Sequence, residues 1–242
     1  MTYVPSPPGA RGRIGVIQPA PGVMIEHEWP AWLPQGLLFP VARVRLTGGG
    51  AADYAALAVA APAAARDLAS AGAGVVAYAC TVGSLFAGAT AEMQLIADLE
   101  AASGKRAIAL ASTCAAALHA VGATRLAILT PYGAETNGWV AAYARSQGFA
   151  VEGFLATPMG IATVGDMPPA AVAALALKGL AALPDADALW IPCTAVQTMA
   201  AIADIEARSN IPVVSGTQAL LWHALRILGI ADPVRGAGQL FG

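Results

Sequence analysis

Two cysteines of this chain, Cys80 and Cys193, stand in similar local sequences. Cys80 follows the apolar run VVAYA, Cys193 follows LWIP, and a threonine comes directly after each of them. A deprotonated thiol can attack an electron-poor carbon, and a thiol–thiolate pair can return and remove protons. Two thiols on opposite sides of one ligand could therefore carry out nucleophilic or acid–base chemistry without a cofactor.

The alternative interpretation is that each cysteine is only a small buried hydrophobic residue, which is common for a lone cysteine. The shared Cys-Thr motif at two matching positions argues against this interpretation for Cys80 and Cys193. The third cysteine, Cys114, has no counterpart in the second half of the chain, where the matching segment reads GTQ. We therefore assign Cys114 to structure.

The elements that must position these thiols recur in the same order. The segment RIGVIQP, which begins at Arg13, is repeated as RLAILTP from Arg125, and each half then has an apolar run that ends at Cys-Thr. Each half closes with a short apolar run and a helical stretch that carries a histidine, His119 or His223. This repetition indicates an internal duplication.

Apolar runs that alternate with helical stretches predict parallel sheets covered by helices on both faces. The runs at residues 13–18, 74–79 and 107–111 are predicted strands, and their repeats fall at 125–130, 188–192 and 211–214. Predicted helices include 113–121, with Ser112 as its N-cap, and 196–208. The fold class is α/β, with two similar Rossmann-like (flavodoxin-like) half-domains related by a pseudo-twofold axis and the active site between them.

The domain organisation follows from the repeat. Residues 1–12 are proline-rich and predict a flexible N-terminal tail. Residues 13–112 together with 216–242 form the first half-domain, and residues 113–215 form the second. The last helix thus returns to the first half.

Ligands of open parallel sheets bind beyond the carboxyl ends of the strands, where both Cys-Thr motifs lie. Backbone N–H groups after each strand can hold a carboxylate and lower the pKa of a thiol. We expect Cys80 to be the resting thiolate. The PAPG turn at residues 19–22 leaves room for substrate. The residues expected to bind substrate are Pro19, Gly22, Thr81, Val82, Tyr132, Thr194 and Ala195.

The composition of the chain limits the kinds of molecule that it can bind. The chain is 57% hydrophobic and 12% charged with a net charge of −2, which excludes a disordered chain and a basic surface for nucleic acid or membrane. Its apolar runs are too short to span a bilayer, and no signal peptide is visible, so we expect a cytoplasmic protein with reduced cysteines. The histidines are isolated, and no metal-ligand spacing, phosphate loop or G-x-S-x-G elbow is present. A homo-oligomer is compatible with this composition.

The segments IGVIQPAPG, VVAYACTVGS, LAILTPYGAETN and LWIPCTAVQTM resemble the aspartate/glutamate racemase superfamily, with the nearest likeness to maleate cis–trans isomerases and arylmalonate decarboxylases. The resemblance covers the chain from Arg13 to about Gly229. It implies a cofactor-independent enzyme for a small carboxylate or dicarboxylate. It also implies that Cys80 adds to the double bond of a maleate-like substrate and that Cys193 exchanges the proton on the neighbouring carbon.

Some features of the sequence favour the maleate isomerases and others favour the arylmalonate decarboxylases. Maleate isomerases have both cysteines, whereas the decarboxylase pattern has glycine at the place of Cys80. Against this, the PAPG turn resembles the decarboxylases, and the asparagines typical of isomerases near Gly22 and near Ala162 and Thr163 are absent. Racemisation or decarboxylation by the same thiols as an acid–base pair therefore stays open. A non-catalytic protein that binds small acids is a third alternative.

The absence of metal and phosphate motifs generates a first prediction. Activity should survive dialysis against a chelator and should need no added nucleotide or pyridoxal phosphate. Activity assays before and after dialysis, together with metal analysis of the purified protein, check this. A stoichiometric metal in the active enzyme would contradict it.

Overall fold

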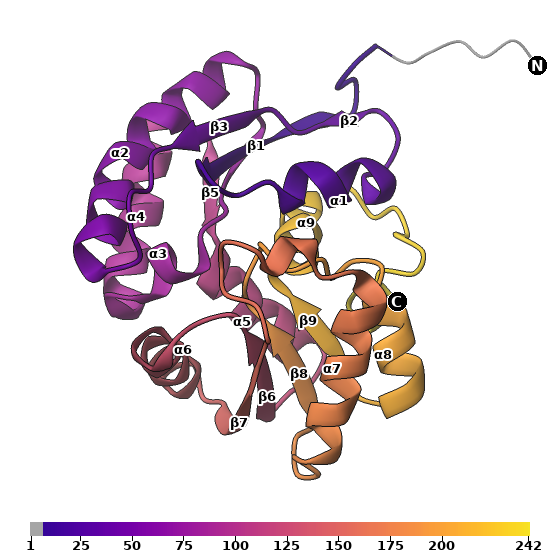
Figure 1. The fold of residues 1–242 in the computed structure, drawn as a ribbon. Coiled ribbons are helices and arrows are strands. Elements are labelled where there is room, and N and C mark those ends of the chain that lie inside the picture. Colours follow the sequence, from indigo (N-terminus) through magenta and orange to yellow (C-terminus); the bar gives the residue numbers. More distant parts are fainter. Residues whose placement is uncertain (1–6) are drawn as a thin grey trace, which may run out of the picture.

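Two parallel sheets with the same strand order form the frame of the protein. The computed structural model describes residues 7–242 (Figure 1). The first half contains β1 (Gly12–Pro19), α1 (Met24–Trp32), β2 (Leu37–Leu38), β3 (Val41–Val44), α2 (Ala51–Ser70), β4 (Val75–Tyr78), α3 (Thr81–Leu85), α4 (Gly88–Ser103), β5 (Arg106–Ala109) and α5 (Leu110–Ala120). The second half contains β6 (Arg125–Thr130), α6 (Ala134–Ser146), β7 (Ala150–Ala156), η1 (Val164–Asp166), α7 (Pro169–Ala181), β8 (Ala188–Ile191), α8 (Ile202–Ser209), β9 (Val213–Ser215), α9 (Gly216–Ile227) and η2 (Gln239–Phe241).

The strand orders match between the halves. The first sheet runs β3–β1–β4–β5, with β2 pairing beside the start of β1, and the second runs β7–β6–β8–β9. Every pairing recorded between these strands is parallel. The α/β fold class and the duplication predicted from the sequence are therefore confirmed.

Helices α5 and α9 lie between the two sheets and share one hydrophobic core with both of them. Ile14 and Val75 of the first sheet and Leu126 and Trp190 of the second belong to this core, and each is at most 1% exposed. Leu220 of α9 is buried in the same core. The halves are thus joined by a continuous apolar core.

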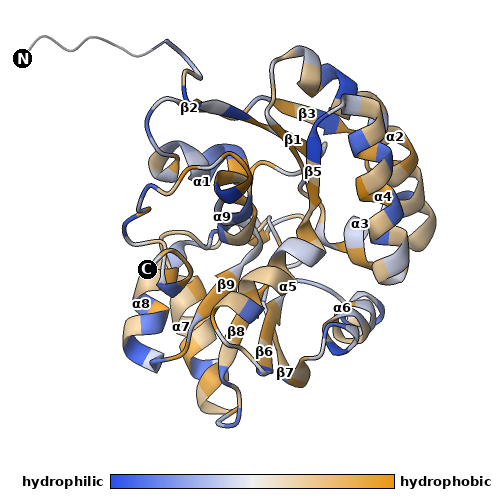
Figure 2. Cartoon of the chain, turned by 180° about the vertical axis from the view of Figure 1, so that it is seen from behind, coloured by the Kyte–Doolittle hydropathy of each residue, from blue (hydrophilic) through white to orange (hydrophobic). Residues whose placement is uncertain are grey.

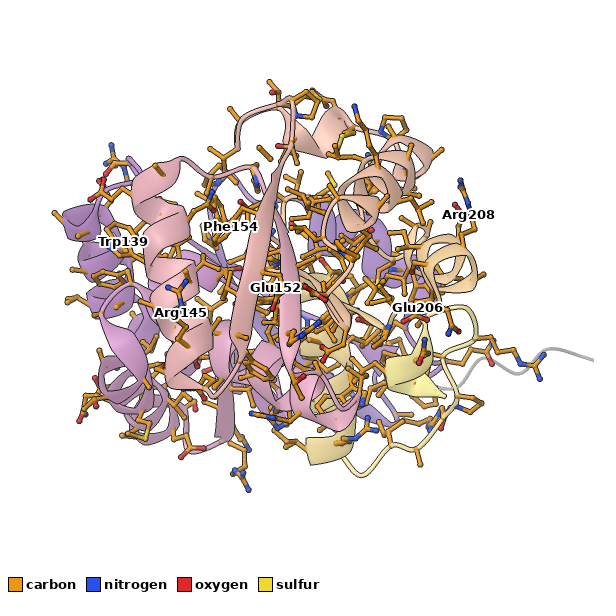
Figure 3. The ribbon with its side chains drawn as sticks, turned by 90° about the horizontal axis from the view of Figure 1, so that it is seen from below. Trp139, Arg145, Glu152, Phe154, Glu206 and Arg208 are labelled. Carbon is orange, nitrogen blue, oxygen red and sulfur yellow. The ribbon has the colours of Figure 1, made fainter. Side chains whose placement is uncertain are left out.

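The outward faces of the sheets have their own cores. Helices α2 and α4 cover the first sheet, and α7 and α8 cover the second. In Figure 2 the strands are mostly hydrophobic, while the outer helices carry hydrophilic residues on their exposed sides. Figure 3 shows Glu152 and Phe154 on β7, the edge strand of the second sheet.

The predicted N-cap at Ser112 is wrong, because α5 already begins at Leu110. Its first N–H groups find acceptors outside their own turn. Ser84 Oγ accepts from the N–H of Ala111 at 3.0 Å, and Glu92 Oε1 accepts from that of Ser112 at 2.8 Å. A local capping signal was therefore not needed at this helix start.

The predicted helix at 196–208 is also wrong at its start, since α8 begins at Ile202 and residues 194–201 form turns and irregular segments. The short elements α1, β2, β3, α3 and β7 were not predicted.

Strand β1 includes Gly12, which the sequence placed in the tail, and Arg11 pairs with Asp232 at 2.5 Å. Residues 1–6 of that tail lie outside the described residues.

The chain passes from the first sheet to the second along α5 and turns back along α9. The predicted boundary at residues 112 and 113 falls inside α5, and the one at 215 and 216 falls where β9 ends and α9 begins. The division into half-domains stays a prediction. Within residues 7–242, no helix has the length and apolar character needed to cross a bilayer.

A core substitution tests the shared packing. Leu220→Ala removes a fully buried side chain between the sheets and should lower the free energy of unfolding by about 2–5 kcal/mol. Val59→Ala on the outer side of α2 is the matched control, because Val59 is 83% exposed, and should change stability by no more than about 0.5 kcal/mol. Equal effects in denaturant titrations would contradict the account of the core.

Candidate active site

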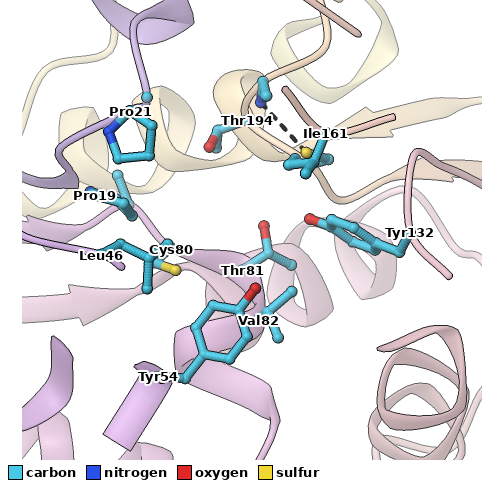
Figure 4. A pocket seen from close by; sticks show the side chains of 14 residues that line it. Pro19, Pro21, Leu46, Tyr54, Cys80, Thr81, Val82, Tyr132, Ile161 and Thr194 are labelled. Atoms are coloured by element: carbon cyan, nitrogen blue, oxygen red, sulfur yellow. Dashed lines mark hydrogen bonds between the residues drawn. The ribbon is translucent and has the colours of Figure 1, made fainter. Parts of the chain in front are cut away.

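One pocket lies between the carboxyl ends of the two sheets (Figure 4), and its volume is about 110 Å³. All nine residues predicted from the sequence line it, namely Pro19, Gly22, Cys80, Thr81, Val82, Tyr132, Cys193, Thr194 and Ala195. Pro21, Leu46, Tyr54, Ala79 and Ile161 complete the lining. The structure therefore brings both thiols to one small cavity, with residues of both halves around it.

Cys80 sits where β4 ends and α3 begins. It is the N-cap of α3, and its Sγ accepts from the N–H of Gly83 at 3.3 Å. Ser84 Oγ donates to the Cys80 carbonyl at 2.9 Å. The thiol is 7% exposed, so the strand end and the helix start together fix its direction toward the pocket.

Gly83 is required by this arrangement. A Cβ at Gly83 would lie 2.5 Å from Tyr78 Oη and 3.0 Å from Cys80 Sγ. Both distances are shorter than ordinary contacts, so only glycine lets the turn of α3 approach the thiol this closely. The sequence analysis did not predict a role for Gly83, although it lies only three residues after Cys80.

Cys193 follows β8, but no helix begins beside it. Its Sγ accepts from the N–H of Ala195 at 3.5 Å, the dashed contact in Figure 4. The Tyr132 phenol and the backbone of Val196 also act to lower the pKa of this thiol, and the Val196 N–H itself donates to the Cys193 carbonyl oxygen at 3.3 Å. Cys193 therefore has more donors around it than Cys80.

A hydrogen bond ties the two cysteine segments together. The Thr81 hydroxyl donates to the carbonyl oxygen of Pro192 at 2.5 Å, and both residues are neighbours of a cysteine. The hydroxyl proton of Thr81 is therefore already used within the protein. Thr81 can offer a substrate its backbone N–H, and its hydroxyl can still accept.

Burial sets the protonation of the thiols. It raises the pKa of Cys80 to about 12, partly offset by the Gly83 N–H, and the nearby Cys193 raises it further. Burial also raises the pKa of Cys193, against which the Tyr132 phenol and the N–H groups of Ala195 and Val196 act. That Cys80 is the resting thiolate stays a prediction, and the larger number of donors that lower the pKa of Cys193 favours the opposite assignment.

Two tyrosines supply neutral donors. Burial holds the pKa of Tyr132 well above its ordinary value and raises that of Tyr54 to about 12, and the facing thiols act in the same direction. Both phenols thus keep their protons at neutral pH. Within residues 7–242 no lysine, arginine or histidine lines this pocket, so an anion would be held by uncharged donors.

Tyr54, Leu46 and Ile161 were missed by the sequence analysis. Tyr54 lies on α2, in an alanine-rich stretch with no motif, and its ring forms an edge-to-face contact with that of Trp139. Leu46 follows β3 and Ile161 precedes η1, in loops with no motif. Only the tertiary fold brings these three residues to the cysteines.

Arg43 at the end of β3 holds the PAPG turn. Its guanidinium donates to the carbonyl oxygens of Ala20 at 2.9 Å and Gly22 at 2.5 Å, and it pairs with Glu26. A Cβ at Gly22 would lie 2.6 Å from Gln18 Nε2, so glycine also allows the turn to close over β1. The PAPG turn, which forms one wall of the pocket, is therefore held in place by Arg43, a residue that does not line the pocket.

In the part of the chain that the structure describes, no three histidine, cysteine or acidic side chains form a group that could hold a metal ion. All three cysteines are free thiols. Two similar α/β halves thus each bring one thiol to a shared pocket, which defines a class of pseudosymmetric proteins with a pair of cysteines at the ligand site.

Residues 14–241 match the family model described as arylmalonate decarboxylase, and the chain belongs to this family. The chain is 29% identical over 245 residues to a maleate isomerase of Pseudomonas putida, an alignment covering 94% of this chain and 96% of the relative. It is also 29% identical over 179 residues to an arylmalonate decarboxylase of Bordetella bronchiseptica, covering 73% and 75% of the two chains.

Solved structures of both kinds share the fold. The maleate isomerase Iso from Pseudomonas putida S16 superposes with a TM-score of 0.85 at 26% identity, covering 95% of this chain and 98% of that one. A Nocardia farcinica maleate cis–trans isomerase variant that carries a covalently bound succinylcysteine intermediate gives a TM-score of 0.86 at 25% identity, with the same coverages. A double mutant of arylmalonate decarboxylase gives 0.87 at 28%, again with these coverages.

The donors around each sulfur generate a prediction about reactivity. Without substrate at pH 7.5, iodoacetamide should label Cys193 faster than Cys80, because more donors stabilise its thiolate. Tyr132→Phe should slow labelling of Cys193 about tenfold, the effect of losing one hydrogen bond to a charged group, and should leave Cys80 nearly unchanged.

Peptide mapping by mass spectrometry measures both rates in the same sample. Labelling of Cys80 should rise about tenfold per pH unit between pH 7 and 10, since its pKa is about 12. Faster labelling of Cys80 at pH 7.5 would contradict the assignment.

Proposed function

We propose that this protein is a cofactor-independent two-cysteine isomerase for a maleate-like unsaturated dicarboxylate. The observation that carries the proposal is the placement of Cys80 and Cys193 at equivalent strand ends of the two halves, lining one pocket. Relatives named maleate isomerase match nearly the full chain, and one of them carries a succinylcysteine. That adduct is the product expected when a thiol adds to the double bond of maleate.

In the proposed reaction the thiol pair shares one negative charge. Cys80 gives its proton to the Cys193 thiolate as substrate binds, and the Cys80 sulfur then adds to one carbon of the double bond. Cys193 delivers the proton to the neighbouring carbon, which leaves a single bond that can rotate. After rotation Cys193 removes a proton from that carbon, the carbon–sulfur bond breaks, and the trans isomer leaves.

The carboxylates meet neutral donors in this scheme. Each half offers backbone N–H groups after its cysteine, and the phenols of Tyr54 and Tyr132 face the same space. Hydrogen bonds from fixed dipoles are strong in a site with little water. They also hold the negative charge that develops on a carboxylate when the sulfur adds to the adjacent double bond.

A second candidate is racemisation or decarboxylation, with the two thiols as an acid–base pair. The apolar lining favours it, because Pro21, Leu46 and Ile161 surround the pocket where a small dicarboxylate would need polar partners. Such a wall suits a substrate with an apolar substituent. The non-catalytic alternative predicts that both cysteines are dispensable for ligand binding.

The substrate prediction is tested by NMR in heavy water with maleate, phenylmalonate and a 2-arylpropionate. We expect maleate to be converted to its trans isomer. Exchange of the arylpropionate α-hydrogen alone would indicate a racemase, and loss of carbon dioxide from phenylmalonate alone would indicate a decarboxylase. Either result would overturn the isomerase assignment.

Two variants separate the roles of the thiols. Cys80→Gly should lower isomerisation by at least about 10³-fold, because the nucleophile is lost, and Cys193→Ala should be similarly inactive. Retention of activity by Cys80→Gly on the natural substrate would favour the decarboxylase. Ligand binding with no turnover of any candidate would favour the binding protein.

A further inference from the structure

The turns after Cys193 take their hydrogen-bond acceptor from the other half of the protein. Glu28 lies on α1, and its Oε1 accepts from the backbone N–H of Thr198 at 2.6 Å and from that of Met199 at 2.8 Å. Glu28 is 7% exposed, and Thr198 and Met199 are fully buried. Without this carboxylate, two buried N–H groups would have no acceptor.

In the first half, the N–H groups after Cys80 find their acceptors within the same segment. Helix α3 begins directly after Cys80, so the carbonyl groups of Cys80 and Val82 accept from the N–H groups of Ser84 and Phe86. After Cys193 the chain stays irregular until α8 begins at Ile202. The Glu28 carboxylate thus replaces the helical acceptors that this segment lacks.

Helix α1 links the two walls of the pocket. It begins two residues after the PAPG turn, and the indole of Trp29 donates to the carbonyl oxygen of Thr217 on α9 at 3.1 Å. The Thr198 hydroxyl donates to Ser215 Oγ, the N-cap of α9, at 2.9 Å. The segment after Cys193 is therefore bonded to α1 on one side and to the start of α9 on the other.

We propose that Glu28 is a positioning residue that holds the segment after Cys193 so that the N–H of Ala195 stays directed at the Cys193 sulfur and the N–H of Val196 at the Cys193 carbonyl oxygen. The inference takes Cys193 as a reacting thiol and so rests on the proposed function. Burial raises the pKa of Glu28 to about 7, while its hydrogen bonds from the N–H groups of Met199 and Thr198 act in the opposite direction. A carboxyl kept at this position despite its burial is consistent with a role that an apolar residue could not fill.

The test measures the reactivity of both thiols and needs no substrate, so it stands even if the proposed reaction is wrong. The ratio of Cys193 to Cys80 labelling by iodoacetamide is determined by peptide mapping in the full-length protein, with Cys80 as the internal reference. Tyr132, Tyr54 and Cys80 are the titratable groups that face Cys193, and none of them is changed. Circular dichroism and the thermal midpoint report whether each variant is folded.

Glu28→Ala should lower the labelling ratio about tenfold at pH 7.5, because the Ala195 N–H that stabilises the Cys193 thiolate is released. Glu28→Gln keeps an acceptor oxygen for the same N–H groups and should stay near the wild-type ratio. If Glu28→Ala does not fold, Glu28→Asp takes its place, since the shorter side chain withdraws the acceptor but keeps the charge.

Glu206→Ala is the matched control. Glu206 is also a buried carboxylate that accepts from two backbone N–H groups, those of Val213 at 2.9 Å and Gln239 at 2.8 Å, and Figure 3 shows it beside the C-terminal segment. Its loss should not change the ratio. An unchanged or raised ratio in Glu28→Ala, an equal change in Glu206→Ala, or a fall in Glu28→Gln as large as in Glu28→Ala would overturn the proposal.

Discussion

The hydrogen bond from the Thr81 hydroxyl to the Pro192 carbonyl is the contact on which the site depends. It joins the residue after one cysteine to the residue before the other, and both residues are buried. Two sheets that pack only through an apolar core could slide relative to each other, because hydrophobic contacts are not directional. A short hydrogen bond at the base of the pocket removes that freedom where the positions of the thiols matter most.

Other polar contacts between the halves support this geometry. Glu92 on α4 accepts from the Tyr143 hydroxyl on α6 at 2.6 Å, and Glu28 on α1 holds the segment after Cys193. Both carboxyls are buried, and burial raises the pKa of each. The duplicated fold therefore supplies two equivalent cysteine positions, and these carboxyls add polar contacts between the elements around them.

The fold and the cysteine pair were predictable from the sequence because they leave periodic signals. The repeated strands end at Cys-Thr, and parallel strands place their carboxyl ends at one edge of a sheet. The different surroundings of the two thiols were not predictable, since α3 begins directly after Cys80 while turns follow Cys193, although both motifs read Cys-Thr. Tyr54 and Glu28 reach their partners only through tertiary packing, and neither lies in a recognisable motif.

The central claim is that Cys80 forms a carbon–sulfur bond while Cys193 handles the proton. The most direct measurement is intact-mass analysis and peptide mapping of Cys193→Ser incubated with maleate at about pH 9. Hydroxide then takes the Cys80 proton in place of Cys193 and water protonates the neighbouring carbon, while the weakly basic serine cannot remove that proton again, so the adduct should accumulate. We predict one substrate molecule per chain, attached to Cys80. A variant that turns over maleate with no adduct, or an adduct on another residue, would contradict the account.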